Sequence, residues 1–240
     1  MQKLFIDYIP NEKIILDGEQ ARHVAKSLRM RVGDTLTISA GDGCDYGCII
    51  DEITQSTVTL TVCYKQACES EPSVKVTLYQ GVPKASKLEE IIQKCTELGV
   101  SEIVPTLTQR SISRPDEKQA KKKNERYQKI ALEAAQQSGR GIIPEVKSMI
   151  KLSQAVREDT AELKIVFYEG GGKPLTELIS RDVKSVSIYI GPEGGFEKSE
   201  VEMIQDAGGV AATLGKRILR TQTAPVAATT AIMLLTGNME

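Results

Sequence analysis

The chain has 240 residues, 40% of them apolar and 26% charged, which is typical of a globular protein that can bury a sizeable core. Its formal net charge of −1 argues against a uniformly basic nucleic-acid-binding chain, so any such surface must be local. No apolar run approaches the length of a membrane span, and charges stand at Lys3 and Asp7. We therefore expect no membrane segment, no signal peptide and a cytoplasmic location.

The first seventy residues read mostly as short strands. Glu19–Met30 interrupts them with the spacing of a short helix, and the polar stretch Lys65–Ser73 is typical of a linker. Residues 1–70 are therefore predicted to form a small β-barrel domain. Its expected strands, rich in Thr, Val and Ile, are Thr35–Ser39, Gly47–Ile53 and Thr57–Tyr64.

From residue 74 onward, predicted strands alternate with predicted helices. This order indicates an α/β domain over residues 74–240, with a mostly parallel sheet covered on both faces. The expected strands are Val74–Gln80, Glu102–Leu107, Lys164–Tyr168, Lys184–Ile190 and Val210–Leu214. The expected helices are Ala85–Leu98, Lys118–Ser138, Lys198–Ala207 and Thr223–Leu235.

The five cysteines and the single histidine, His23, lack the spacing of a zinc site, so we expect no metal. The positive charge is clustered. Residues 110–140 hold nine Lys or Arg against four Asp or Glu. Candidate RNA-binding side chains are Arg22, Arg29 and Arg31 in the barrel and Lys121, Lys122 and Arg126 in the α/β domain. Taken singly, Arg29 and Arg31 are just as readily ordinary surface charges, and Lys121–Lys123 taken alone are more readily the solvated face of a helix.

Two backbone-rich segments follow predicted strands, at the edge where ligands of open α/β sheets bind. The first is Gly191-Pro192-Glu193-Gly194-Gly195, and the second runs from Leu214 to Arg220. Glycines allow a backbone to approach a ligand closely. Neither segment has the pattern of a dinucleotide fingerprint or a phosphate loop, which weakens the interpretation as a nucleotide hydrolase or nucleotide-binding switch.

These segments belong to a wider set of motifs that closely resembles the RsmE-type ribosomal RNA (uracil-N3)-methyltransferases of the SPOUT class. The resemblance covers nearly the whole chain. Its motifs are Gly191–Phe196 with Ser199 and Glu200, Leu214-Gly215 with Arg217–Thr221, Thr223 and Ala224, His23 with Leu28-Arg29-Met30, Lys94 with Glu97–Val100, Pro105, Arg110-Ser111, and Glu133–Ala135 with Gln137–Arg140. The family usually has Glu where this chain has Gln222.

The resemblance implies a PUA-like barrel followed by a SPOUT α/β domain with a deep trefoil knot. It implies a homodimer that uses S-adenosylmethionine to methylate N3 of one uridine in 16S rRNA, within the small ribosomal subunit, without a metal or a membrane. The implied cofactor-binding residues are Glu169, Ile190, Gly191, Glu193, Gly194, Gly195, Leu214, Gly215, Ile218, Leu219 and Ala224.

Methyl transfer to uracil N3 requires a cationic group near the base oxygens to stabilise the developing anion. Arg220, Arg110 and Arg140 are the candidates, and the pattern does not single out the group that removes the N3 proton. A non-catalytic RNA-binding factor in ribosome assembly would share the barrel and the basic clusters. It would not need the two glycine-bearing segments.

Overall fold

The computed structural model describes residues 3–112 and 117–239. The chain folds into two compact units. The first comprises the residues up to Glu71 together with Ala135–Ile143, and the second comprises Pro72–Ala134 and the residues from Pro144 onward. The first boundary lies close to the predicted linker, but the segment Ala135–Ile143 groups with the first unit although the sequence placed it in the second domain. Within the described ranges, no helix is long and apolar enough to cross a membrane.

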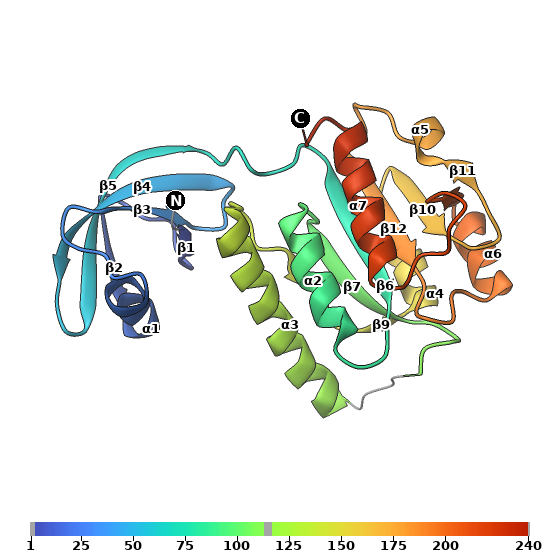
Figure 1. Cartoon of the computed structure of the whole chain (residues 1–240), viewed down its shortest axis with the longest axis horizontal. Coiled ribbons are helices and arrows are strands. Elements are labelled where there is room, and N and C mark those ends of the chain that lie inside the picture. Colours follow the sequence, from blue (N-terminus) through green and yellow to red (C-terminus); the bar gives the residue numbers. More distant parts are fainter. Residues whose placement is uncertain (1–2, 113–116, 240) are drawn as a thin grey trace. The chain divides into compact units, whose positions relative to one another are not determined.

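The first unit is built on a five-stranded sheet of order β1-β3-β4-β5-β2 (Figure 1). Only the β1–β3 pair is parallel. The strands bury alternate side chains, such as Ile14 and Leu16 of β2, in one apolar core. Their bounds are Lys3–Phe5 (β1), Lys13–Asp17 (β2), Thr35–Ser39 (β3), Cys44–Ile53 (β4) and Thr57–Ala67 (β5).

The predicted helix Glu19–Met30 is shorter and less regular in the structure. Helix α1 spans Gly18–Arg22 and continues as a π-helical segment, His23–Ser27. Arg29 follows with φ 53°, a left-handed conformation that costs a non-glycine residue roughly 1–2 kcal/mol. A π-helical segment beside a strained residue is often found at functional sites, because the surrounding structure must hold both in place.

The second unit contains an eight-stranded sheet of order β11-β13-β10-β12-β6-β7-β8, with β9 also paired to β7. All its pairs are parallel, as predicted. The bounds are Lys75–Gly81 (β6), Glu102–Leu107 (β7), Glu145–Val146 (β8), Ile150–Lys151 (β9), Leu163–Phe167 (β10), Lys173–Pro174 (β11), Ser185–Ile190 (β12) and Val210–Thr213 (β13).

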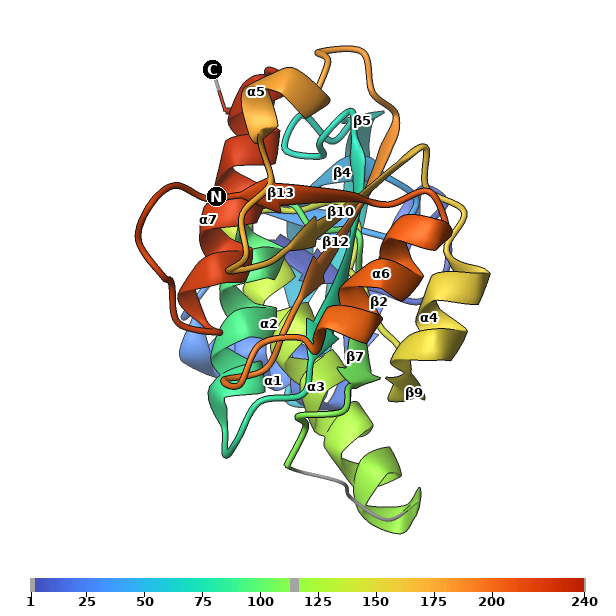
Figure 2. The same ribbon diagram turned by 90° about the vertical axis from the view of Figure 1, so that its right-hand side faces the viewer.

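Helices cover both faces of this sheet. Helices α2 and α7 pack together on one face, and α4 and α6 lie on the other (Figure 2). The apolar stripe of α2 buries Leu88, Ile91 and Cys95, and burial raises the pKa of the Cys95 thiol to about 12. The bounds are Lys87–Glu97 (α2), Glu117–Ser138 (α3), Leu152–Glu158 (α4), Leu175–Leu178 (α5), Lys198–Asp206 (α6) and Thr223–Leu235 (α7).

Candidate active site

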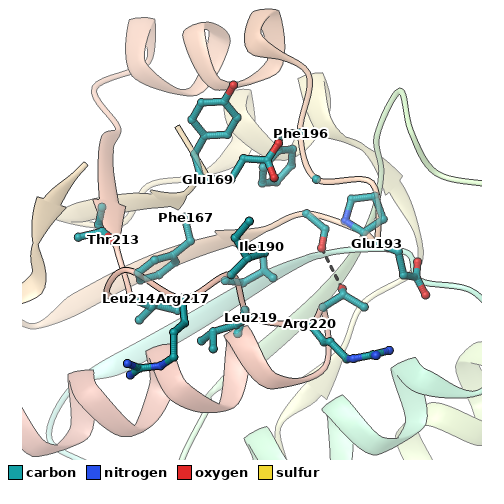
Figure 3. Close-up of a pocket in the computed structure, with 18 of the residues that line it drawn as sticks. Phe167, Glu169, Ile190, Glu193, Phe196, Thr213, Leu214, Arg217, Leu219 and Arg220 are labelled. Carbon is teal, nitrogen blue, oxygen red and sulfur yellow. Dashed lines mark hydrogen bonds between the residues drawn. The ribbon is translucent and has the colours of Figure 1, made fainter. Parts of the chain in front are cut away.

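A cavity of about 650 Å³ opens at the carboxyl ends of the adjacent strands β10, β12 and β13 (Figure 3). This is the edge at which parallel sheets bind their ligands. Ten of the eleven residues predicted to bind the cofactor line the cavity: Glu169, Ile190, Gly191, Glu193, Gly195, Leu214, Gly215, Ile218, Leu219 and Ala224. The eleventh, Gly194, does not line it, whereas the catalytic candidate Arg220 does.

The loop after β12 is a tight turn that only glycine permits. A Cβ on Gly191 would lie 2.9 Å from the Gly195 carbonyl carbon and 3.1 Å from the Phe196 nitrogen. Gly195 has φ +70°, and its amide donates a hydrogen bond of 2.9 Å to the Pro192 carbonyl. Because Gly191 and Gly195 have no side chains, the backbone of this loop can contact a ligand in the cavity directly.

Two side chains, those of Thr221 and Gln80, donate hydrogen bonds to the Gly191 carbonyl and hold it in place. The Thr221 hydroxyl, at the entry to α7, donates to it at 2.9 Å, as the dashed line in Figure 3 shows. The fully buried amide of Gln80, at the end of β6, donates to the Thr221 hydroxyl at 3.2 Å and to the Gly81 carbonyl at 3.0 Å. The two predicted loops are thus joined by buried hydrogen bonds, which fixes the shape of the cavity between them.

The cavity has an apolar middle and polar groups at its margin. Figure 3 shows Phe167, Ile190 and Leu219 together in the middle. The Gln222 Oε1 atom is buried without a hydrogen-bond partner, and the exposed Arg220 side chain makes no ion pair with any described residue. An apolar slot with unsatisfied polar groups beside it suits a ligand that combines a flat base with charged ends.

Glu193 lies at the cavity margin in an ion pair with Lys87 of α2. The Lys87 Nζ atom is 2.6 Å from the Glu193 Oε1 atom, and the Lys84 amide donates to the same carboxylate at 3.1 Å. Burial alone would raise the pKa of the Glu193 carboxyl, but these donors outweigh it and the pKa is lowered. The ion pair therefore ties the loop after β12 to the start of α2 at neutral pH.

Arg110 supports the same loop from outside the cavity. Its Nε atom donates to Glu197 at 2.8 Å, and its guanidinium donates to the Gly194 carbonyl at 2.5 Å. A Cβ on Gly194 would meet the Arg110 side chain at 3.2 Å. Arg110 therefore lies at the predicted loop, and its guanidinium donates hydrogen bonds to Glu197 and Gly194 of the protein.

Arg140 is not brought to the cavity. It belongs to the first unit, where its side chain is 3% exposed and its Nη2 atom lies 2.8 Å from Glu71. Glu71 also accepts hydrogen bonds from the amides of Gly141 and Ile142. This arrangement anchors the segment after α3 to the first unit, so the structure supports a stabilising role for Arg140.

Replacing Arg140 by methionine is expected to lower the free energy of unfolding by about 3 kcal/mol, because the largely buried Glu71 carboxylate would lose its cation. Urea unfolding measures this change. Adding Glu71→Gln to the variant removes the uncompensated charge and should restore part of the loss. A direct catalytic role would instead appear as a fall in kcat with unchanged unfolding.

The basic residues of the first unit are exposed. Arg22 donates to the Gly18 carbonyl at 3.2 Å, whereas the side chains of Arg29 and Arg31 make no ion pair within the described ranges. Arg29 has a left-handed backbone just after the π-helical segment. These residues form a candidate phosphate-contacting surface.

The basic residues of the second unit lie on α3. Lys121 and Lys122 are exposed, but Arg126 forms an ion pair of 2.6 Å with Glu89 of α2. Arg126 is therefore engaged within the chain, and the two lysines are the better candidates for contact with phosphates. Among the residues the structure describes, no group of three or more His, Cys, Asp or Glu side chains could hold a metal ion.

Several residues of the cavity were not predicted. Phe167 ends β10 and Tyr168 follows it, and Lys87 comes from α2. The end of β10 meets the two predicted loops only because β10 lies between β12 and β13, and strand order is not encoded in local patterns. Gln80 and Thr221, which fix the Gly191 carbonyl, likewise give no signal beyond being polar residues at strand and helix ends.

Two family models match the chain. Residues 69–233 match an RNA methyltransferase domain, and residues 16–63 match an RNA methyltransferase PUA domain. The barrel of the first unit is therefore PUA-like, as the sequence resemblance implied.

Relatives and solved structures agree with these models. A Bacillus subtilis protein named ribosomal RNA small subunit methyltransferase E is 36% identical, covering 97% of this chain and 96% of its own length. A Neisseria gonorrhoeae enzyme of the same name, solved bound to S-adenosyl methionine, has a TM-score of 0.90 at 28% identity over 98% of each chain. A Legionella pneumophila putative methyltransferase, solved with the bound cofactor SAM, has a TM-score of 0.85 at 30% identity, covering 97% of this chain and 96% of that one. The chain thus belongs to the RNA methyltransferase family whose relatives carry the name ribosomal RNA small subunit methyltransferase E.

Proposed function

We propose that this protein transfers the methyl group of S-adenosylmethionine to N3 of one uridine in 16S rRNA. The observation that carries the proposal is the cavity between the Gly191–Gly195 and Leu214–Arg220 loops, in a chain of this family. The names of the relatives favour this activity over that of a non-catalytic assembly factor.

The residues present fit this cofactor. Phe167, Ile190 and Leu219 offer apolar surfaces for an adenine ring, and Gly191 and Gly195 line the cavity beside them. The orphaned Gln222 Oε1 atom can accept a hydrogen bond from a bound amino group. We propose that the predicted cofactor-binding residues act in this way, with Gly194 contributing only to the shape of the loop.

When bound, the cofactor supplies a methyl group already activated by its sulfonium. The chain's task is then to align the uracil nitrogen with that methyl group and to stabilise the anion formed when the N3 proton leaves. Arg220 lines the cavity with its guanidinium unpaired among the described residues, so it is the best candidate to donate to uracil O2 or O4. Arg110 has its donors on Glu197 and Gly194, which favours a positioning role.

The substrate is proposed to be the small ribosomal subunit, contacted through the exposed Arg29 and Arg31 of the PUA-like barrel and through Lys121 and Lys122. The test is methylation of purified small subunits and of naked 16S rRNA with labelled cofactor, followed by mapping of the product nucleotide. Labelled 3-methyluridine at one position supports the proposal. Cofactor binding without transfer to either RNA would contradict it.

We further propose that the second unit is a SPOUT trefoil knot and that the protein is a homodimer. The bonds from Thr221 to Gly191 and Gln80, which hold the entry to α7 against an earlier loop, support the knot. Helix α7 supports the dimer, since it has no charged residue and most of its residues are apolar. Leu234 is 57% exposed there, and a helix that is apolar all round is usually buried.

Replacing Leu234 by glutamate is expected to convert the dimer into a monomer, because a charge on the outer side of α7 cannot be buried without a partner. Light scattering after size-exclusion chromatography measures the mass. Met203→Glu, at an exposed apolar residue of α6 on the other face of the sheet, is the matched control and should remain dimeric. A dimeric Leu234→Glu variant would place the interface elsewhere.

A further inference from the structure

The second unit has a second cavity, of about 420 Å³. It lies at the part of the sheet formed by β6, β7, β8 and β9. It shares no lining residue with the active-site cavity. Its lining comes from strands β6 to β9 and from helices α3 and α4: Tyr79, Glu102, Val104, Asn124, Glu145, Val146, Lys147, Ser148, Ile150 and Glu158.

Negative charge is concentrated around this cavity. Glu102 and Glu145 face each other in register on β7 and β8, an arrangement of like charges that is unfavourable unless a cation lies between them. The Lys147 ammonium does so, 2.5 Å from Glu145 and 3.5 Å from Glu102. The walls therefore already accommodate one alkylammonium group, which belongs to the chain.

The other carboxylate of the lining, Glu158, has no cationic partner among the described residues, although the Gln154 amide donates to it at 3.0 Å. Glu158 is the last residue of α4, where its carboxylate opposes the helix dipole. The next residue, Asp159, is buried behind the lining, where it accepts hydrogen bonds from the Ser187 and Tyr189 hydroxyls and from the Ala161 amide. Glu158 is thus a carboxylate of the cavity lining whose charge a cationic ligand could neutralise.

Tyr79 provides an independent sign of a ligand. Its side chain is 7% exposed, its ring stacks on Tyr189 at 4.6 Å between centroids, and its hydroxyl has no hydrogen-bond partner within the described ranges. Burial raises the pKa of the Tyr79 hydroxyl, and the charges of Asp159, Glu102 and Glu158 raise it further. Tyr79 lines the cavity together with Glu102 and Glu158.

The chemistry of the lining selects the ligand. A metal ion needs several ligands that converge on one point, and the described residues contain no such group. An aliphatic polyamine carries separate ammonium groups on an apolar stem, each with N–H donors for carboxylates and hydroxyls. We propose that this cavity binds a linear polyamine, with one ammonium group between Glu158 and the Tyr79 hydroxyl and another beside Glu102 and Glu145.

The proposal goes beyond methyl transfer, and its test measures binding alone. Calorimetric titration of the full chain with spermidine is expected to show saturable binding to one site. Tyr79→Phe and Glu158→Gln should each weaken it about tenfold, the effect of losing one charge-assisted hydrogen bond. Glu202→Gln removes a carboxylate paired with Lys198 on α6 and should bind as the wild type does.

A titration with magnesium chloride at matched ionic strength tests whether the heat measured with spermidine arises from charge screening alone. The proposal is overturned if magnesium gives the same heat as spermidine, if no saturable binding occurs, or if Glu158→Gln binds like the wild type. It is also overturned if Glu202→Gln weakens binding as much as Glu158→Gln. Glu158 is exposed, so this variant stays informative even where thermal melting shows that Tyr79→Phe disturbs the buried ring stack.

Discussion

Arg220→Ala is expected to lower kcat for methyl transfer by about 10²–10³-fold, the effect of removing one donor that stabilises a developing anion. S-adenosylmethionine affinity should change by no more than about threefold, because the lost interaction is made mainly in the transition state. The substitution leaves the backbone intact, and the Arg220 carbonyl can still accept hydrogen bonds from the amides of Thr223 and Ala224 at the start of α7. The side chain itself makes no ion pair with any described residue, so the fold should survive its loss. Single-turnover methylation and cofactor calorimetry separate the two effects.

Arg157→Ala is the matched control, since it removes an exposed arginine from α4, away from the active-site lining. Its kcat should equal that of the wild type. Arg220→Lys keeps the charge but loses the planar pair of donors, so intermediate activity is expected. Wild-type turnover by Arg220→Ala would remove Arg220 from the reaction and return Arg110 to consideration.

Gly191→Ala is expected to weaken S-adenosylmethionine binding by about 10- to 100-fold, the scale of forcing one extra carbon into a packed backbone turn. The new Cβ would lie within 2.9–3.1 Å of the Gly195 and Phe196 backbone, which has no flexible end to move aside. The turn must open, and the wall of the cavity moves with it. Calorimetry with the cofactor gives the affinity, and thermal melting reports whether the fold survives.

The neighbouring Gly194→Ala is its control. The nearest atoms to a Cβ there belong to the Arg110 side chain, at 3.2 and 3.3 Å, and that side chain can shift. Its affinity should stay within about threefold of the wild type. Equal losses in both variants would show that the crowding at Gly191 has no special bearing on the cofactor.

Elements with strong periodicity or clear ends could be predicted from the sequence. Strands β3 and β7 and helix α7 have the expected bounds, since β-branched runs and a proline in the first helical turn define them locally. Shorter elements gave no such signal. Strands β8 and β9 have two residues each, and α4 has seven, so their formation depends on packing against β7.

The site was predictable where chemistry follows the local chain. Gly191 stands out because the turn leaves no room for a Cβ, and Gly195 because its φ is +70°. Contacts between distant segments were not readable in the same way. Nothing in the local pattern distinguishes Arg140, which ends in an ion pair with Glu71, from Arg220, which ends at the cavity. Burial and partners decide between the two, and both arise only in the folded chain.

The return of residues 135–143 to the first unit limits how this protein can be taken apart. A fragment ending at Glu71 would lack Arg140 and the amides of Gly141 and Ile142. The side-chain carboxylate of Glu71 would then lose all three of these donors. Such a truncated barrel is expected to be less stable than the complete first unit. A fragment that keeps the native contacts needs residues 135–143 joined to it as a tethered peptide. Recombination between relatives would have to exchange both pieces together.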